Sequence, residues 1–163
     1  MEEVMKNKLS TICFLLKEDK VLLGMKQRGF GAGKWNGFGG KPEPEKEETM
    51  EDVAKREILE EAKLSVNQAN LEKVAIIDFF EDNDLVFRSH VFLIRKWTGT
   101  PQETEEMKPR WFHLSEIPYE DMWSADKEWI PLALSGKKFK ATIHFEPGMD
   151  AVKSFKYREV SDL

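Results

Sequence analysis

Apolar residues occur along the chain in short runs, separated by polar turns and by clusters of glycine and proline. Short runs rich in β-branched and aromatic side chains are typical of strands. Such runs predict strands over residues 9–16, 21–26, 71–80, 85–97, 110–114, 139–145 and 152–158. The turns 17–20, 81–84 and Pro147-Gly148 join three pairs of these strands into expected hairpins.

One stretch follows a helical period instead. Its apolar residues recur at every fourth position, so one face of the helix can dock on a sheet. This helix is predicted over residues 50–62, with a stripe of Met50, Ala54, Ile58 and Ala62. Thr49 is a good N-cap, and Asp52 three residues later resembles the second half of a capping box. A second helix is predicted over residues 127–134, and residues 117–123 form a loop or a short helix.

These elements predict an α+β fold in which a mixed sheet carries a helix on either side. The chain has 163 residues, of which 40% are hydrophobic and 34% charged, as in a soluble globular protein with one sizeable core. No internal repeat or linker divides the sequence. We therefore expect a single domain over residues 1–163.

The net charge of −5 is placed unevenly. Residues 43–61 hold nine acidic and three basic residues, whereas the remainder holds 22 basic and 21 acidic residues. Without a basic stripe, nucleic-acid binding is not expected. The longest apolar run, residues 12–16, is too short to span a membrane, and residues 1–10 lack a signal-peptide core. The single cysteine, Cys13, lies in that run, which fits a buried side chain and a reducing, cytoplasmic location.

Candidate chemistry is concentrated between residues 29 and 64. Six glycines lie within residues 29–40, and Trp35 and Phe38 between them favour an ordered loop that lets backbone approach a ligand. Farther along, the carboxylates of Glu57, Glu60 and Glu61 share one helix face and repel one another. An oxygen-rich cluster of this type suits Mg²⁺ or Mn²⁺, and the simpler alternative is a solvated acidic face.

The same residues resemble the Nudix box, G-x5-E-x7-R-E-U-x-E-E-x-G-U, in which U is apolar. The matching positions are Glu48, Arg56, Glu57, Ile58, Glu60, Glu61 and Leu64. Two features depart from the pattern: seven residues separate Gly40 from Glu48, and Lys63 stands where the family has a glycine. A left-handed backbone at Lys63 would cost roughly 1–2 kcal/mol, unless the helix ends in another way.

The resemblance covers nearly the whole chain, from about Leu9 to Val160, and is strongest to one subfamily, the animal MutT homologues. The similar stretches are residues 24–41, 90–92, 105–112, 117–123, 137–139 and 157–160. Membership would imply the Nudix α/β/α sandwich and a Mg²⁺-dependent pyrophosphohydrolase. Such an enzyme converts oxidised purine nucleoside triphosphates of the 8-oxo-dGTP type to the monophosphate and pyrophosphate, which sanitises the nucleotide pool. We expect a monomer whose partner is this small nucleotide, with no membrane or nucleic acid involved.

The resemblance also implies the site. The metal ligands would be the carboxylates of Glu57, Glu60, Glu61 and Glu106 and the backbone carbonyl of Gly39. Arg56 would orient the carboxylates, with Glu48 as its partner, and either Glu57 or Glu61 could act as general base. The implied nucleotide pocket consists of Thr11, Lys26, Asn36, Phe38, Gly39, Gly40, Lys41, Trp123, Ser124, Ala125 and Asp126.

Base recognition can be read from a few of these residues. Trp123 can stack on a purine, and the amide of Asn36 offers a donor and an acceptor to its edge. Where the subfamily has two adjacent aspartates, this chain has Ala125 and Asp126. An ionised Asp126 only accepts hydrogen bonds, which suits the paired N–H donors of guanine. We therefore expect oxidised guanine nucleotides to be preferred to oxidised adenine nucleotides.

Two alternatives stay open. A Nudix enzyme with the same box could hydrolyse an unmodified (d)NTP, ADP-ribose or a dinucleoside polyphosphate. A non-catalytic Nudix module could bind nucleotide without turnover, but its usual sign is a lost box carboxylate, and all are present here.

Overall fold

The computed structural model describes residues 5–163. Its strands form one mixed eight-stranded sheet. The strands are β1 (Leu9–Lys17), β2 (Lys20–Lys26), β3 (Trp35–Asn36), β4 (Glu72–Glu81), β5 (Asp84–Ile94), β6 (Met107–His113), β7 (Phe139–Phe145) and β8 (Val152–Glu159). Their order is β3-β2-β1-β5-β4-β7-β8, and β6 pairs with β2. The β1–β5 and β4–β7 pairs are parallel, and the three predicted hairpins are antiparallel.

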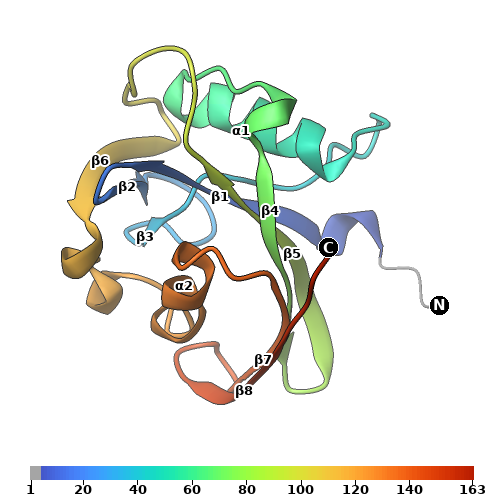
Figure 1. Cartoon of the computed structure of the whole chain (residues 1–163). Coiled ribbons are helices and arrows are strands. Elements are labelled where there is room, and N and C mark those ends of the chain that lie inside the picture. Colours follow the sequence, from blue (N-terminus) through green and yellow to red (C-terminus); the bar gives the residue numbers. More distant parts are fainter. Residues whose placement is uncertain (1–4) are drawn as a thin grey trace.

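Two α-helices, α1 (Met50–Ala62) and α2 (Asp126–Leu134), cover opposite faces of this sheet (Figure 1). Alternation along β1 explains the two layers, because successive side chains of a strand point to opposite faces. Cys13 packs in the core beneath α1 with Ile58, whereas Phe14 packs beneath α2 with Trp129. The predicted α+β sandwich and the burial of Cys13 are thereby confirmed. No helix within residues 5–163 is long and apolar enough to cross a membrane.

Four short 3₁₀ turns complete the described chain, at Lys6–Lys8, Gln68–Asn70, Leu114–Glu116 and Tyr119–Asp121. Two strand predictions need correction, and one strand was missed. β5 ends at Ile94 instead of Trp97, whose ring stacks on Trp111 at a centroid distance of 5.8 Å. β6 begins at Met107 instead of Arg110, because an edge strand tolerates a proline such as Pro109. The two-residue strand β3 was not predicted within the glycine-rich loop.

Both ends of α1 follow from local chemistry. Thr49 Oγ1 accepts a hydrogen bond from the Asp52 N–H, and Asp52 Oδ2 accepts one from the Thr49 N–H, so the predicted capping box is confirmed. At the other end, Lys63 adopts the left-handed conformation with φ 61° and ψ 33°, and its N–H donates to the Leu59 carbonyl. The helix therefore ends as a glycine-terminated helix would, with a lysine in the strained position.

Replacing Lys63 with glycine should raise the free energy of unfolding by about 0.5–1 kcal/mol, because glycine adopts this backbone without the steric cost. Urea unfolding followed by circular dichroism measures the change. Lys63→Ala is the matched control, since alanine removes the exposed side chain and keeps the cost. Equal stabilities for the two variants would contradict the assignment of strain to this residue.

Candidate active site

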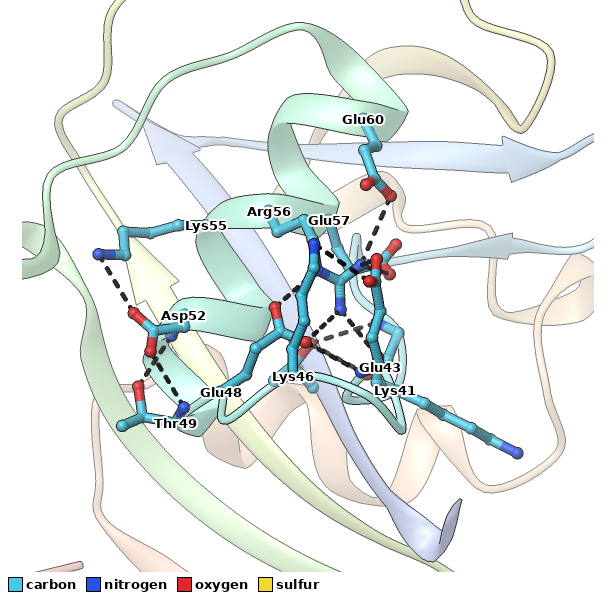
Figure 2. A network of polar contacts seen from close by, with 12 residues as sticks. Lys41, Glu43, Lys46, Glu48, Thr49, Asp52, Lys55, Arg56, Glu57 and Glu60 are labelled. Carbon is cyan, nitrogen blue, oxygen red and sulfur yellow. Dashed lines mark hydrogen bonds and ion pairs between the residues drawn. The ribbon is translucent and has the colours of Figure 1, made fainter. Parts of the chain in front are cut away.

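Arg56 is the centre of the polar network on α1 (Figure 2). Its Nε donates to Glu48 Oε2 at 2.7 Å and its Nη2 donates to Glu48 Oε1 at 3.0 Å, which makes the pair bidentate. The two side chains are only 16% and 10% exposed, so solvent screens the pair weakly. Hydrogen bonding to Arg56 lowers the pKa of Glu48, which is therefore ionised at neutral pH. The predicted partnership of Arg56 with Glu48 is confirmed.

The longer loop before the helix does not move Glu48 away from Arg56. The Glu43 N–H donates to Glu48 Oε1 at 2.9 Å, and Lys46 Nζ lies 3.1 Å from Glu43 Oε2. The loop thus closes on itself while Glu48 keeps both contacts to the guanidinium. Arg56 Nη2 also donates to the Lys41 carbonyl at 3.0 Å, which fixes the end of the glycine-rich loop to the helix.

Glu61 is the buried member of the carboxylate cluster, only 2% exposed. Its Oε1 accepts a hydrogen bond from the Gly39 N–H at 2.9 Å. Burial raises the pKa of Glu61 to about 8, and repulsion from Glu57 and Glu106 acts in the same direction. A cation bound beside Glu61 would offset this cost and hold the carboxylate in its ionised form.

Two glycines give the loop its close approach to these carboxylates. A Cβ on Gly39 would overlap the Thr11 carbonyl oxygen, and one on Gly40 would lie 2.6 Å from the carboxyl carbon of Glu57. The Gly40 N–H donates to Thr11 Oγ1 at 3.2 Å, so the loop is also hydrogen-bonded to β1. A larger residue at Gly39 would push the loop away from β1, and one at Gly40 would displace the carboxylate of Glu57.

The other predicted metal ligands have cationic partners. Arg56 Nη1 donates to Glu57 Oε1 at 2.7 Å and lies 3.5 Å from Glu60 Oε2. Glu106 accepts a hydrogen bond from Arg28 Nη2 at 3.0 Å, and Lys26 Nζ lies 3.9 Å from its other oxygen.

With the guanidinium groups in these positions, no three acidic, histidine or cysteine side chains among residues 5–163 converge as a metal site. The chemistry of the donors nevertheless fits a hard divalent cation, because every predicted ligand is an oxygen and burial raises the pKa of both Glu57 and Glu61. The assignment of Glu57, Glu60, Glu61, Glu106 and the Gly39 carbonyl to metal stays a prediction.

A cleft with a volume of about 310 Å³ opens beside Glu61. Most of the predicted pocket residues line it: Thr11, Lys26, Asn36, Gly39, Gly40, Lys41, Trp123 and Asp126. Three do not. The Phe38 ring is fully buried in the core beneath α1, Ala125 is buried in the core beneath α2, and Ser124 Oγ donates to the Met149 carbonyl. Burial keeps the side chains of Phe38 and Ala125 out of the cleft, whereas the assignment of Ser124 to substrate binding stays a prediction.

Several aromatic residues of the cleft were not predicted. Phe79 and Phe87 line it from β4 and β5, and Phe145 from β7, which only the sheet order brings together. Phe30 is different, because a lone aromatic between Gly29 and Gly31 was a usable signal in the sequence. Its ring is exposed and stacks on Trp123 at a centroid distance of 4.9 Å, so it covers part of the surface expected to receive a base.

Asp126 begins α2 at the wall of the cleft. It is 4% exposed, and its carboxylate accepts a hydrogen bond from the Trp123 N–H at 3.2 Å. Burial raises the pKa of Asp126 to about 7. At neutral pH the protonated and ionised forms are therefore both populated, which corrects the expectation of a purely ionised acceptor.

Comparison with known proteins agrees with this geometry. The sequence matches the NUDIX domain over residues 6–133. It is 47% identical over 158 residues to the oxidized purine nucleoside triphosphate hydrolase of Mus musculus and 43% identical to that of Danio rerio, each match covering 96% of this chain and 98% of the relative. The crystal structure of a mutator MutT protein from Bacillus halodurans superimposes with a TM-score of 0.75 at 26% identity, covering 91% of this chain and 96% of that one.

In metal-free buffer, Glu61→Gln should increase the free energy of unfolding near pH 8 by on the order of 1 kcal/mol or more. The folded protein keeps the Glu61 proton up to a pKa of about 8, whereas the unfolded chain loses it near the ordinary value. The stability of the parent therefore falls as pH rises between these two values, and the advantage of the amide should vanish at pH 4. Urea unfolding at pH 4, 6 and 8 measures it.

Glu60→Gln is the matched control, because it makes the same change on the same helix face at a side chain that is 53% exposed instead of buried. Addition of Mg²⁺ should stabilise the parent more than Glu61→Gln. A Glu61→Gln variant that is equally stabilised by Mg²⁺ would show that this carboxylate does not bind the cation.

Proposed function

The chain belongs to the NUDIX family, and from this premise we propose that it is a Mg²⁺-dependent pyrophosphohydrolase of oxidised purine nucleoside triphosphates. The products would be the nucleoside monophosphate and pyrophosphate, and the role would be to sanitise the nucleotide pool. We further propose that it works as a cytoplasmic monomer on free nucleotides, without nucleic-acid or membrane partners.

One observation carries the proposal: a single cleft joins an aromatic end to the carboxylate cluster. Trp123 and Asp126 provide a stacking surface and a hydrogen-bonding group at one end, while Glu61 and the backbone of Gly39 and Gly40 line the other. This polarity matches a purine nucleotide whose base is held by aromatic side chains and whose phosphates reach the metal site.

The basic residues of the cleft fit the same orientation. Lys26 Nζ lies 3.9 Å from Glu106 Oε2, where it would neutralise phosphate oxygens, whereas Lys41 Nζ lies 5.1 Å from the centre of the Phe87 ring at another wall of the cleft. Lys34 Nζ lies 5.2 Å from the centre of the Trp123 ring and supports the indole from the side of the glycine-rich loop.

Enzymes of this family generally use a divalent metal ion. Here the ligands would be Glu57, Glu60, Glu61, Glu106 and the Gly39 carbonyl, and the bound metal would neutralise the phosphates and lower the pKa of a coordinated water. The chain's own residues fix the site: Arg56 holds Glu57 in place, and the Gly39 N–H orients Glu61. Glu57 or Glu61 would accept the proton of the attacking water.

The main alternative is another nucleotide substrate for the same machinery. Turnover of 8-oxo-dGTP, 2-hydroxy-dATP, dGTP, dATP and ADP-ribose with Mg²⁺ separates the possibilities when phosphate and pyrophosphate are measured independently. We expect kcat/KM for 8-oxo-dGTP to exceed that for dGTP at least tenfold, with pyrophosphate as the released product. A preference for dGTP or ADP-ribose would overturn the proposed substrate.

Glu57→Gln and Glu61→Gln should each lower kcat for 8-oxo-dGTP by about 100-fold or more, because each removes a charged oxygen from the proposed metal site. Circular dichroism should show an unchanged fold. Glu105→Gln is the control, since Glu105 is a neighbouring acid whose side chain is 86% exposed. Full turnover in both site variants would exclude this mechanism.

The preference for oxidised guanine over oxidised adenine should rise between pH 6 and pH 8. Burial places the pKa of Asp126 at about 7, and the ionised, acceptor-only form that suits guanine replaces the protonated form across this range. The ratio of kcat/KM for 8-oxo-dGTP to that for 2-hydroxy-dATP measures the effect and cancels the ionisation of the shared metal site. In Asp126→Asn the ratio should not change with pH; a sloping ratio in that variant would assign the titration elsewhere.

A further inference from the structure

A second cleft lies on the face of the sheet that points away from α2, and it shares no residue with the active-site cleft. Its volume is about 670 Å³. Along β7, the side chains of Phe139 and Ala141 enter the core beneath α2, so those of Lys140 and Thr142 point to the opposite face. The helix on that face, α1, packs on β1 and β6 and leaves β7 and β8 uncovered (Figure 1).

Strand register arranges the lining residues in two rows across β5, β4, β7 and β8. The first row is His90, Ile76, Lys140 and Arg158, and the second is Arg88, Asp78, Thr142 and Lys156. Leu9 of β1 lies beside Arg88 and extends the second row. Because adjacent strands lie about 4.8 Å apart, each row of four spans about 14 Å.

The β8 end of this cleft is strongly cationic. Lys140 lies directly opposite Arg158, and Lys156 is two residues along the same strand. Like charges opposite one another destabilise a sheet. Among residues 5–163, none of the three forms an ion pair, whereas the nearby Glu159 pairs with Lys137 at 3.3 Å. Three convergent cations in a chain with a net charge of −5 are the arrangement that a bound anion would stabilise.

The other end of the cleft is apolar. Leu9 and Ile76 line it, with the imidazole of His90 beside them. Burial lowers the pKa of His90 to about 4, so at neutral pH this ring is an uncharged aromatic surface. Between the two ends, Arg88 is held by Asp78 through hydrogen bonds of 2.7 and 2.9 Å and adds little net charge to the middle.

We propose that this cleft is a second nucleotide site that takes a nucleoside monophosphate, with the phosphate at Lys140, Lys156 and Arg158 and the base over Ile76 and His90. A nucleoside monophosphate joins an anionic group to an aromatic ring within one small molecule, and each end of the cleft offers a partner for one of them. Three cations close together suit a single phosphate group, whereas a nucleic acid would require a longer basic stripe. The site does not depend on the proposed hydrolysis.

Titration of the full chain with GMP in metal-free buffer, followed by ¹H–¹⁵N spectra, tests the site. We expect saturable shifts of the amides of residues 140–142 and 156–158. The Lys140→Gln/Arg158→Gln double variant should weaken this binding at least tenfold. Amides of Asn36 and Gly39 report occupancy of the active-site cleft separately and should respond alike in both proteins. Lys17→Gln/Lys96→Gln, which removes two exposed charges outside both clefts, is the matched control.

Three results would overturn the proposal. The amides of β7 and β8 could stay unchanged up to millimolar GMP, or respond equally in the Lys140→Gln/Arg158→Gln variant. Inorganic phosphate could bind as tightly as GMP, which would leave the apolar end without a role. A single-stranded oligonucleotide could bind more tightly than GMP, which would make this face a nucleic-acid surface.

Discussion

The site depends on the guanidinium of Arg56, which donates hydrogen bonds to groups from three parts of the chain. It binds Glu48 from the preceding loop, the Lys41 carbonyl from the glycine-rich loop, and Glu57 from its own helix. Because these charges are largely buried, loss of the arginine would leave several carboxylates unpaired in a poorly solvated region. The loop, the helix and the carboxylate face therefore keep their mutual positions through one side chain.

The walls of the cleft come from the sheet and not from the Arg56 network. β1 runs through the middle of the fold and sends alternate side chains into the cores beneath α1 and α2. Thr11 of that strand binds the Gly40 N–H, while the cleft beside it is walled by aromatic residues of β4, β5 and β7. The carboxylate cluster is thus local in sequence, and the nucleotide-sized cleft is a product of long-range strand pairing.

This difference explains how much the sequence could predict. The bounds of α1, its capping box and the Arg56–Glu48 pair depend on spacing within about twenty residues, and each agrees with the structure. Phe79, Phe87 and Phe145 meet only because β4 pairs with both β5 and β7, which no local pattern reveals. Phe38 was assigned to the cleft, but its ring turns into the core. The pKa of Asp126 depends on its burial, which composition and spacing do not determine.

The contacts of Glu106 have a consequence for the order in which ligands bind. Its side chain pairs with Arg28 and its carbonyl accepts a hydrogen bond from the Gln27 N–H, so it is attached to the base of the loop that carries Phe30. Phe30 in turn rests on Trp123. A ligand that draws Glu106 from Arg28 therefore acts on the loop that covers the base end of the cleft. Metal and nucleotide are thermodynamically linked in such an arrangement. The factor by which bound metal changes the affinity for nucleotide equals the factor by which bound nucleotide changes the affinity for metal.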